Sequence, residues 1–499
     1  MRLAMAVASP EPRRTHVPEG LHFAGKMRLW QGLVVLVLVP AVLCGNRRKP
    51  ANSDRNDSGS HGATSSSHGA TSSSNGATSS SHGAASSSHN TASSSHGSSS
   101  GSHSGSGGHT TTYLGWDLFD VASIAPFFNL ENYGLPSHLD LLSFNTGTGT
   151  TVLAVAEDKM RNFMQKLTDA GVSFQNTLQD ISQMFVRPLT YDHTRSLRRG
   201  DATFDRYMHY EEIVSYIEDL PAKYPDEVQV EEIGRSVEDR PIYIVSINRR
   251  NDSSSAEKPV IFVEAGTYAR EWVSPASALY LVERLLEDSP SLSQDAEWRV
   301  IPLLNPDGYV YSWRYDRLWK KNRAPSSVPE CFGVDLNKNF DLHWGEIGSS
   351  INPCSNMYHG QRPFSEPETK ALRDAMYEVE NRTKAYVSLH SFGQTLHYPV
   401  LYDDDVNRTS LEELDRIAVG MAARIEATSG ANYTVRSPEP FIIGGTSENW
   451  AASRGVPYVY TLELRDKGET VFHLPEELIA STGEDVWAAM KYLVSHLEE

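Results

Sequence analysis

The chain has 499 residues and a formal net charge of −18 with histidine counted as neutral. Its length allows one large domain together with something smaller. The acidic balance argues against nucleic acid as a partner, because phosphates attract a basic surface. Cysteine is scarce, with only Cys44, Cys331 and Cys354 in the whole chain.

Residues 1–45 are predicted to be a leader that contains a signal peptide. Lys26 and Arg28 precede the apolar run LWQGLVVLVLVPAVLCG, which ends in small residues. The run is too short for a stable membrane span. We therefore expect secretion with cleavage near Cys44, and Met27 is an alternative start. Removal of Cys44 leaves an even pair of cysteines in an oxidising compartment. Five Asn-x-Ser/Thr sequons agree with that route, at Asn56, Asn251, Asn381, Asn407 and Asn432.

Residues 46–112 form a linker rich in Ser, His and Gly. Most of it repeats HGATSSS, and no position of the repeat carries a large apolar side chain. Such a composition cannot bury enough surface to fold, so a disordered linker is predicted. Six histidines recur at multiples of seven residues, at His61, His68, His82, His89, His96 and His103. These histidines could bind metal ions, although expansion of the repeat by slippage is the simpler explanation for their regular spacing.

Residues 113–188 are predicted to be ordered. The segment TVLAVAEDKMRNFMQKLTDAGVSF predicts a strand, an amphipathic helix closed by a glycine, and a second strand. These elements indicate a small α+β unit. Residues 189–204 are then polar and basic, and they include Arg195, Arg198 and Arg199. A basic linker between two folded units is a natural site for cleavage by a trypsin-like protease.

From residue 205 to residue 499, strand-like and helical segments alternate. The strands are predicted at PIYIVSIN, PVIFVEAG, RVIPLLN, AYVSLHS and VPYVYTLEL. One helix is expected to begin at Ser274 and Pro275, and another at a capping box of Ser365 and Glu368. Apolar strands that alternate with helices predict an α/β domain, with a buried, mostly parallel mixed sheet flanked by helices.

Polar side chains follow three of these strands where each strand ends. PVIFVEAG runs into TYARE, AYVSLHS carries His390, and VPYVYTLEL carries Glu463. Ligands in open α/β sheets bind at the carboxyl ends of the strands. One buried His or Glu is most often a satisfied core residue, but several at strand ends of one domain favour a functional site.

Seven motifs follow one another in this domain: TYAREWVSP, LNPDGY, RLWKKNR, GVDLNKNF, LHSFGQ, GGTSENW and LELRDKG. In this order and spacing they resemble the zinc metallocarboxypeptidases of the A/B type. The resemblance implies a carboxypeptidase-like fold, a zinc cofactor and removal of C-terminal residues from peptides. It also implies that residues 113–188 are an inhibitory pro-segment and that residues 189–204 are cleaved on activation. Cys331 and Cys354 stand where the family has a disulfide.

The resemblance also assigns zinc ligands. In the family, a His and a Glu three residues later bind zinc, a second His completes the site, and water takes the open position. The Glu corresponds to Glu271 and the second His to His390, but Tyr268 stands in place of the first His. A phenol binds zinc only as phenolate, from an ordinary pKa of about 10. We therefore expect a weakened or absent zinc site. Glu463 corresponds to the carboxylate that activates the zinc-bound water.

Further positions that meet the substrate in the family are changed. Lys320 replaces the arginine that stabilises the oxyanion, and Asn337 with Lys338 replaces the Asn-Arg pair that holds the terminal carboxylate. Lysine keeps the charge but lacks the bidentate fork of arginine. Phe441 replaces the tyrosine that caps the substrate, whereas Arg270, which helps to hold the peptide, is retained.

Glu448 corresponds to the residue at the base of the family's side-chain pocket. There it would select a C-terminal Lys or Arg; otherwise it is an ordinary exposed glutamate of a loop. Two functions stay open. One is a secreted, monomeric carboxypeptidase with impaired catalysis, and the other is a pseudoenzyme that binds peptide C-termini without cutting them. A mucin-like structural protein would explain the repeat but not the large domain.

Overall fold

The structure is a computed structural model. It describes residues 113–122, 139–145, 150–185, 200–249, 257–287, 292, 295–399, 401, 409–436 and 443–497, all within the compact unit Gly101–Glu499. The predicted leader, the repeat linker, most of the basic linker and Phe441 lie outside the described residues. Among the helices of the described ranges, none is both long and apolar enough to cross a membrane.

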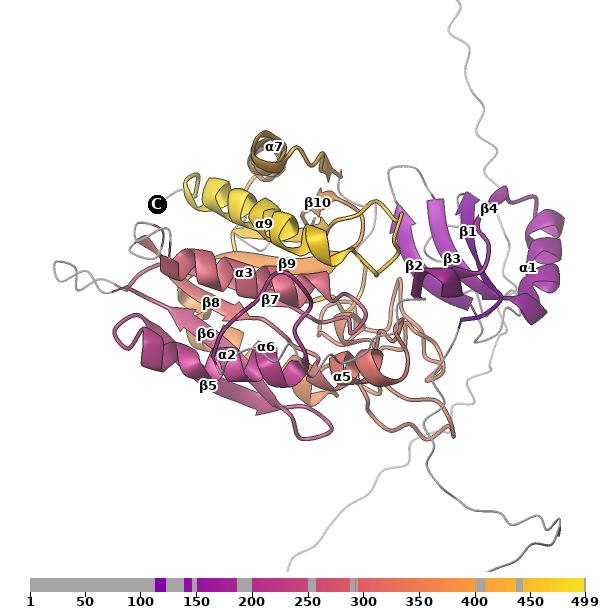
Figure 1. Cartoon of the computed structure of the whole chain (residues 1–499), viewed down its shortest axis with the longest axis horizontal. Helices are drawn as coiled ribbons and strands as arrows, with labels where there is room; N and C mark the ends of the chain where they lie inside the picture. Colours follow the sequence, from indigo (N-terminus) through magenta and orange to yellow (C-terminus); the bar gives the residue numbers. More distant parts are fainter. Residues whose placement is uncertain are drawn as a thin grey trace, which may run out of the picture. The chain divides into compact units, whose positions relative to one another are not determined.

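The N-terminal part is a four-stranded antiparallel sheet with one helix (Figure 1). Its strands, in the order β2-β3-β1-β4, are β1 (Trp116–Ala122), β2 (Leu139–Asn145), β3 (Thr150–Ala156) and β4 (Phe174–Leu178). Helix α1 (Glu157–Asp169) buries Phe163 and Leu167 in the apolar cluster of this sheet, and a short helix η2 spans Ile181–Phe185. The predicted strand-helix-strand segment is confirmed as β3, α1 and β4.

The C-terminal part is built on an eight-stranded sheet in the order β11-β10-β12-β9-β7-β8-β6-β5. The strands are β5 (Val228–Arg235), β6 (Pro241–Ile247), β7 (Val260–Ala265), β8 (Glu297–Ile301), β9 (Thr383–Ser391), β10 (Thr395–His397), β11 (Thr434–Val435) and β12 (Tyr458–Leu464). The central strands β12, β9, β7 and β8 are parallel, whereas β10 and β6 run antiparallel to their central neighbours. The predicted, mostly parallel mixed sheet is therefore confirmed.

Helices cover both faces of this sheet. One apolar cluster contains α2 (Tyr210–Lys223), α3 (Val273–Glu287), α7 (Leu411–Ser429) and α9 (Ile479–Val494), and a second contains α6 (Pro367–Val379) and α8 (Ser447–Ser453). Along β7, Ile261 and Val263 belong to the first cluster and Phe262 to the second, because successive strand side chains point to opposite faces. The remaining helices are α5 (Pro306–Arg314), η4 (Leu336–Lys338), η5 (Glu380–Arg382) and η6 (Glu476–Leu478). Helix α3 begins one residue before the predicted Ser274.

The predicted capping box of Ser365 and Glu368 is wrong. Because a proline begins α6, the N-cap is Glu366, and Ser365 donates a hydrogen bond to Glu366 Oε1 (2.6 Å). Glu368 turns inward and is fully buried. There its carboxyl group accepts from Asn322 Nδ2 (3.1 Å) and from a backbone N–H between β5 and β6 (3.2 Å). Burial raises the pKa of Glu368 to about 8.

We expect Glu368→Gln to reduce the dependence of stability on pH. In the unfolded chain this carboxyl group ionises near its ordinary pKa of 4.5, whereas in the folded chain it keeps its proton up to about pH 8. The folded state binds more protons between these values, so stability falls as pH rises through that window. Urea unfolding near pH 5 and near pH 8 measures the fall. Glu378→Gln, on the half-exposed side of the same helix, is the control. A fall of equal size in Glu368→Gln and wild type would contradict the prediction.

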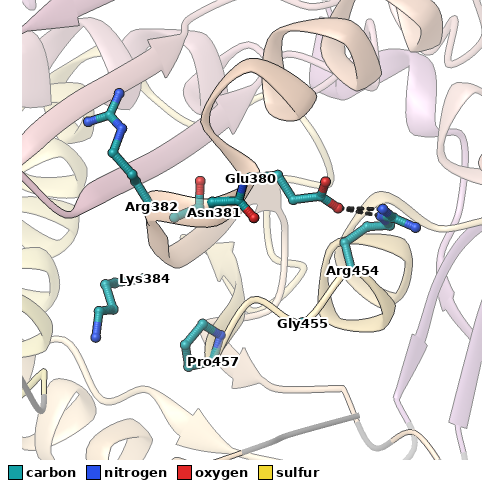
Figure 2. A pocket seen from close by; sticks show the side chains of 8 residues that line it. Glu380, Asn381, Arg382, Lys384, Arg454, Gly455 and Pro457 are labelled. Atoms are coloured by element: carbon teal, nitrogen blue, oxygen red, sulfur yellow. Dashed lines mark hydrogen bonds and ion pairs between the residues drawn. The ribbon is translucent and has the colours of Figure 1, made fainter. Parts of the chain in front are cut away.

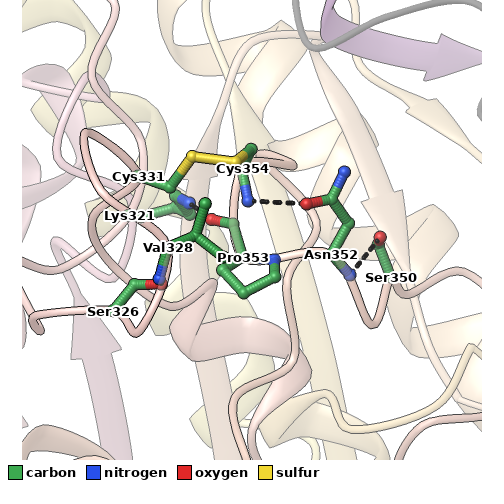
Figure 3. Close-up of a disulfide and its surroundings, with 8 residues drawn as sticks. All are labelled: Lys321, Ser326, Val328, Cys331, Ser350, Asn352, Pro353 and Cys354. Carbon is green, nitrogen blue, oxygen red and sulfur yellow. Dashed lines mark hydrogen bonds between the residues drawn. A yellow bond between two sulfur atoms is a disulfide. The ribbon is translucent and has the colours of Figure 1, made fainter.

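Cys331 and Cys354 form the predicted disulfide, with their Cα atoms 4.8 Å apart (Figure 3). Lys321, which precedes this loop in the chain, donates from Nζ to Pro353 O (2.8 Å). The hydrogen bond also holds the backbone next to Cys354. The bond closes a loop with a sequence separation of 23 residues.

Replacement of both cysteines by serine should lower the free energy of unfolding by about 3 kcal/mol, because the unfolded chain regains the entropy of the open loop. The measurement is urea unfolding of the double variant, of the wild type, and of the wild type under reducing conditions. The double variant and the reduced wild type should agree with each other. Equal stability of the oxidised wild type and the double variant would show that the disulfide does not stabilise the fold.

Candidate active site

The loop that follows β7 turns sharply at Gly266. Its φ of +66° lies in the left-handed region, which favours glycine. A side chain would also find no room, because a Cβ here would lie 2.7 Å from Leu303 Cδ1. The tight turn brings Tyr268 to Glu271 back over the carboxyl end of the sheet, directly before α3.

Glu264, near the end of β7, holds this loop to its neighbours. Its carboxylate is fully buried and accepts hydrogen bonds from Thr267 Oγ1 (2.5 Å), Ser388 Oγ (2.5 Å) and Ser447 Oγ (2.9 Å). The three hydroxyls come from the loop, from β9 and from α8. Sequence reasoning missed Glu264, although a glutamate inside the apolar run PVIFVEAG is a visible signal.

The structure brings Glu271, His390 and Glu463 together. His390 Nδ1 lies 3.0 Å from Glu271 Oε2, and each of the two side chains is 4 % exposed. His390 and Glu463 are direct partners in the parallel register of β9 and β12. The polar residues that the sequence places at the ends of three strands therefore lie close together.

The charges of these groups are coupled. Burial opposes protonation of His390, but the adjacent Glu271 carboxylate outweighs burial and raises the pKa of His390 to about 10. Burial raises the pKa of Glu271 as well, and the adjacent His390 opposes that rise. Burial also raises the pKa of Glu463 to about 7.

Tyr268 packs against His390 as a neutral ring. The centroids of the two rings are 4.9 Å apart, with an angle of 53° between their planes. Lys320 Nζ lies 4.2 Å from the centroid of the Tyr268 ring and makes a cation–π contact with it. Burial raises the pKa of the phenol well above its ordinary value of 10. Phenolate, the only form of tyrosine that binds zinc, is therefore disfavoured at this position.

The donor atoms present do not make the three-ligand site that catalytic zinc uses. Within the described residues, no group of three or more His, Cys, Asp or Glu side chains could hold a metal ion. Glu271 and His390 are two donors of the right kind and lie side by side, and Tyr268 supplies no third donor while its phenol is protonated.

Two lysines stand beside these groups. Lys320 Nζ forms an ion pair with Asp335 Oδ2 (2.7 Å), and both side chains are buried. Asp335 also accepts from Asn337 N (3.1 Å), so one carboxylate positions both Lys320 and the turn of η4. Lys338 Nζ donates to Asn337 O (3.1 Å), and burial lowers the pKa of Lys338. Sequence reasoning did not assign Asp335, although it stands inside the motif GVDLNKNF.

Glu448 lies next to this turn. It is half-buried in the first turn of α8, and Asn337 Nδ2 donates to Glu448 Oε2 (3.3 Å). Ser447 N donates to Asn337 Oδ1 (2.8 Å), so the amide is held at both ends. The structure therefore places Glu448 beside Asn337 rather than in an exposed loop.

Arg270 is occupied by the N-terminal part of the chain. Its Nη1 donates to Asp140 Oδ2 (2.8 Å) and its Nη2 to Leu141 O (3.0 Å), and the residue is 2 % exposed. Asp140 Oδ1 also accepts from Asn356 Nδ2 (2.8 Å). The arginine that was expected to hold a peptide thus binds a segment of β2. No local pattern in the sequence marks Asp140.

Comparison with known proteins finds matches over much of the chain. Residues 213–489 match the family described as zinc carboxypeptidase. A carboxypeptidase B from Helicoverpa zea is 34 % identical over 397 residues, which cover 75 % of this chain and 92 % of that protein. This chain belongs to the zinc carboxypeptidase family.

Relatives and solved structures extend the match. A carboxypeptidase B from Astacus astacus is 35 % identical over 300 residues, which cover 59 % of this chain and 97 % of that protein. A carboxypeptidase A from Helicoverpa armigera superposes with a TM-score of 0.69 and 29 % identity, covering 78 % of this chain and 99 % of that chain. The thrombin activatable fibrinolysis inhibitor superposes with a TM-score of 0.65 and 28 % identity, covering 77 % and 99 %. The A/B-type resemblance and its fold are confirmed.

Tyr268→His should raise zinc binding, because it supplies the third protein ligand that this family member lacks. Loss of a side chain that only hydrogen-bonds to a metal ligand costs about 10–100-fold in metal affinity, so a new direct ligand should gain at least that. Zinc bound per chain at buffered free zinc, near neutral pH, is the measurement. Tyr268→Phe removes the hydroxyl without adding a ligand, so it should match the wild type. Full occupancy of the wild type, lost in Tyr268→Phe, would show that Tyr268 is a working ligand.

Proposed function

We propose that this protein is a secreted member of the zinc carboxypeptidase family that binds peptide C-termini and whose hydrolysis of them is impaired. The observation that carries the proposal is Tyr268, which stands where the family has a zinc-binding His and packs against His390 as a neutral ring. Secretion is supported by the disulfide, because structural disulfides are rare in the cytosol, and by the apolar leader expected from the sequence.

Parts that would recognise a C-terminal carboxylate are in place. Lys338 can donate three hydrogen bonds, and one of them goes to Asn337 O. A peptide carboxylate beside Lys338 would favour its charged form, which burial disfavours. Glu448 beside Asn337 supplies a negative charge suited to the side chain of a C-terminal Lys or Arg. None of these contacts needs a metal ion.

Release of Arg270 is the second part of the proposal. In the intact chain, Asp140 and Leu141 occupy its guanidinium group. Cleavage by a trypsin-like protease in the basic linker, residues 189–204, would allow the N-terminal part to dissociate and leave Arg270 free for a peptide. The cleaved domain is proposed to act as a monomer.

An active carboxypeptidase is the second candidate, and Glu463 favours it. Its pKa of about 7 suits a general base at neutral pH, because proton transfer is most effective when the pKa lies near the working pH. The two candidates differ in turnover rather than in the peptides that they bind.

Peptide binding by the trypsin-cleaved protein tests the proposal. A short peptide ending in Lys should bind more tightly than the same peptide with a C-terminal amide, because Lys338 donates to the free carboxylate. Hydrogen bonds to charged groups contribute about 1.5–3 kcal/mol, so Lys338→Met should weaken binding of the free acid roughly 10- to 100-fold. Binding of the amide should change little. Glu448→Gln should reduce the ratio of the affinity for a peptide that ends in Lys to the affinity for one that ends in Leu.

Controls separate the candidates. Lys384→Met, at the amino end of β9 and remote from His390, should leave all these affinities unchanged. Mass spectrometry of the same samples measures release of the C-terminal residue. Equal binding of free acid and amide would contradict C-terminus recognition. Rapid release by wild-type protein would contradict impaired hydrolysis and establish the active enzyme.

A further inference from the structure

A pocket of about 560 Å³ lies at the end of the sheet away from the candidate site (Figure 2). It is lined by Glu380, Asn381, Arg382, Thr383, Lys384, Arg454, Gly455 and Pro457. Helix η5 directly precedes β9, and Pro457 directly precedes β12. His390 and Glu463 lie near the other ends of these two parallel strands. The pocket is therefore separated from the candidate site by the length of both strands.

Asn381 is the acceptor residue of an Asn-Arg-Thr sequon, the signal for N-linked glycosylation in secreted chains. Its side chain is exposed and stands at the pocket, next to Glu380 and Arg382. Thr383, the third residue of the sequon, is buried and donates to Val379 O (2.9 Å), which fixes the backbone of the tripeptide. We infer that Asn381 carries an N-linked glycan whose first sugars lie in this pocket. The inference rests on secretion, which is part of the proposed function.

The lining of the pocket suits an N-acetylglucosamine core, which offers hydroxyl groups and an acetamide carbonyl as acceptors. Arg454 donates to Glu380 Oε1 (2.6 Å) and is 42 % exposed, so its guanidinium is held at the edge with further N–H donors available to a ligand. Lys384 supplies an ammonium group at the same pocket. Gly455 leaves room because it has no side chain, and Pro457 offers an apolar surface to a sugar ring.

The position of Asn381 also keeps a glycan away from bound peptide. Asn432, the other sequon in the described ranges, differs in this respect. Its backbone oxygen accepts from Gln394 Nε2 (3.1 Å), and a Cβ at the neighbouring Gly393 would lie only 3.2 Å from Glu463 Cβ, so Asn432 is tied to the segment beside Glu463. Asn432 does not line the pocket. A glycan on Asn381 therefore has a built surface to lie on and leaves the carboxyl end of the sheet open.

Site occupancy is the first test. The full chain is expressed behind a foreign secretion leader, so that modification is read independently of its own leader and of peptide binding. Mass spectrometry should find a glycan on Asn381 that peptide N-glycosidase removes. Asn381→Gln should lose one glycan, whereas Thr383→Ser, which preserves the sequon, should keep it. Secreted protein that carries no glycan at Asn381 would overturn the assignment.

The rate of glycan release from native protein tests the role of the pocket. Sugars held by the pocket should leave native protein about tenfold more slowly than denatured protein, the factor that corresponds to about 1.4 kcal/mol. Lys384→Ala should speed native release at Asn381. Lys491→Ala, on α9, should leave the rate unchanged. Native release that is as fast as release from denatured protein, with no effect of Lys384→Ala, would overturn the contact between glycan and pocket.

Discussion

Three hydroxyl groups meet at the buried carboxyl group of Glu264, and the geometry of the candidate site depends on that junction. A buried carboxyl group without hydrogen-bond partners costs several kcal/mol, so its partners must stay in place for the domain to fold. Those partners are Thr267, Ser388 and Ser447. They fix the loop after β7, the carboxyl end of β9 and the start of α8. The candidate site residues are therefore positioned by a carboxyl group that is not itself one of the expected zinc ligands or substrate contacts.

The buried charges of the site are balanced by side chains of the chain itself. His390 faces Glu271, and Lys320 pairs with Asp335 while lying over the ring of Tyr268. A cation over an aromatic face contributes about 0.5–2 kcal/mol, depending on how far it is desolvated. Removing one partner of a buried ion pair is strongly destabilising, because the other charge is left uncompensated. Internal pairing thus explains how this site stays folded with only two donors of the usual zinc set.

The large sheet could be predicted because its strands are strongly apolar and alternate with helices; VPYVYTLEL, for example, became β12. Strands β10 and β11 were not predicted, because segments of three and two residues carry too little pattern. Strand β5 was also missed, because its sequence VQVEEIGR is mostly polar. The candidate site residues were predicted from the motifs of the family. Glu264 and Asp140 were not predicted: Ser388, one partner of Glu264, lies 124 residues away in the chain, and Arg270, the partner of Asp140, lies 130 residues away. Local sequence does not report contacts over such separations. The capping box failed for a local reason, since the proline at the start of α6 moved the cap by one residue.

The register of β9 against β12 has a consequence for how such a protein can change its role. A slip of β9 by one residue would turn His390 to the opposite face together with every apolar side chain of that strand, and a slip of β12 would do the same to Glu463 and its neighbours. The two polar groups therefore face the site for the same reason that the interior is filled. A substitution that abolishes catalysis does not change this register. The fold can be reused as a scaffold for recognition without any change to its interior.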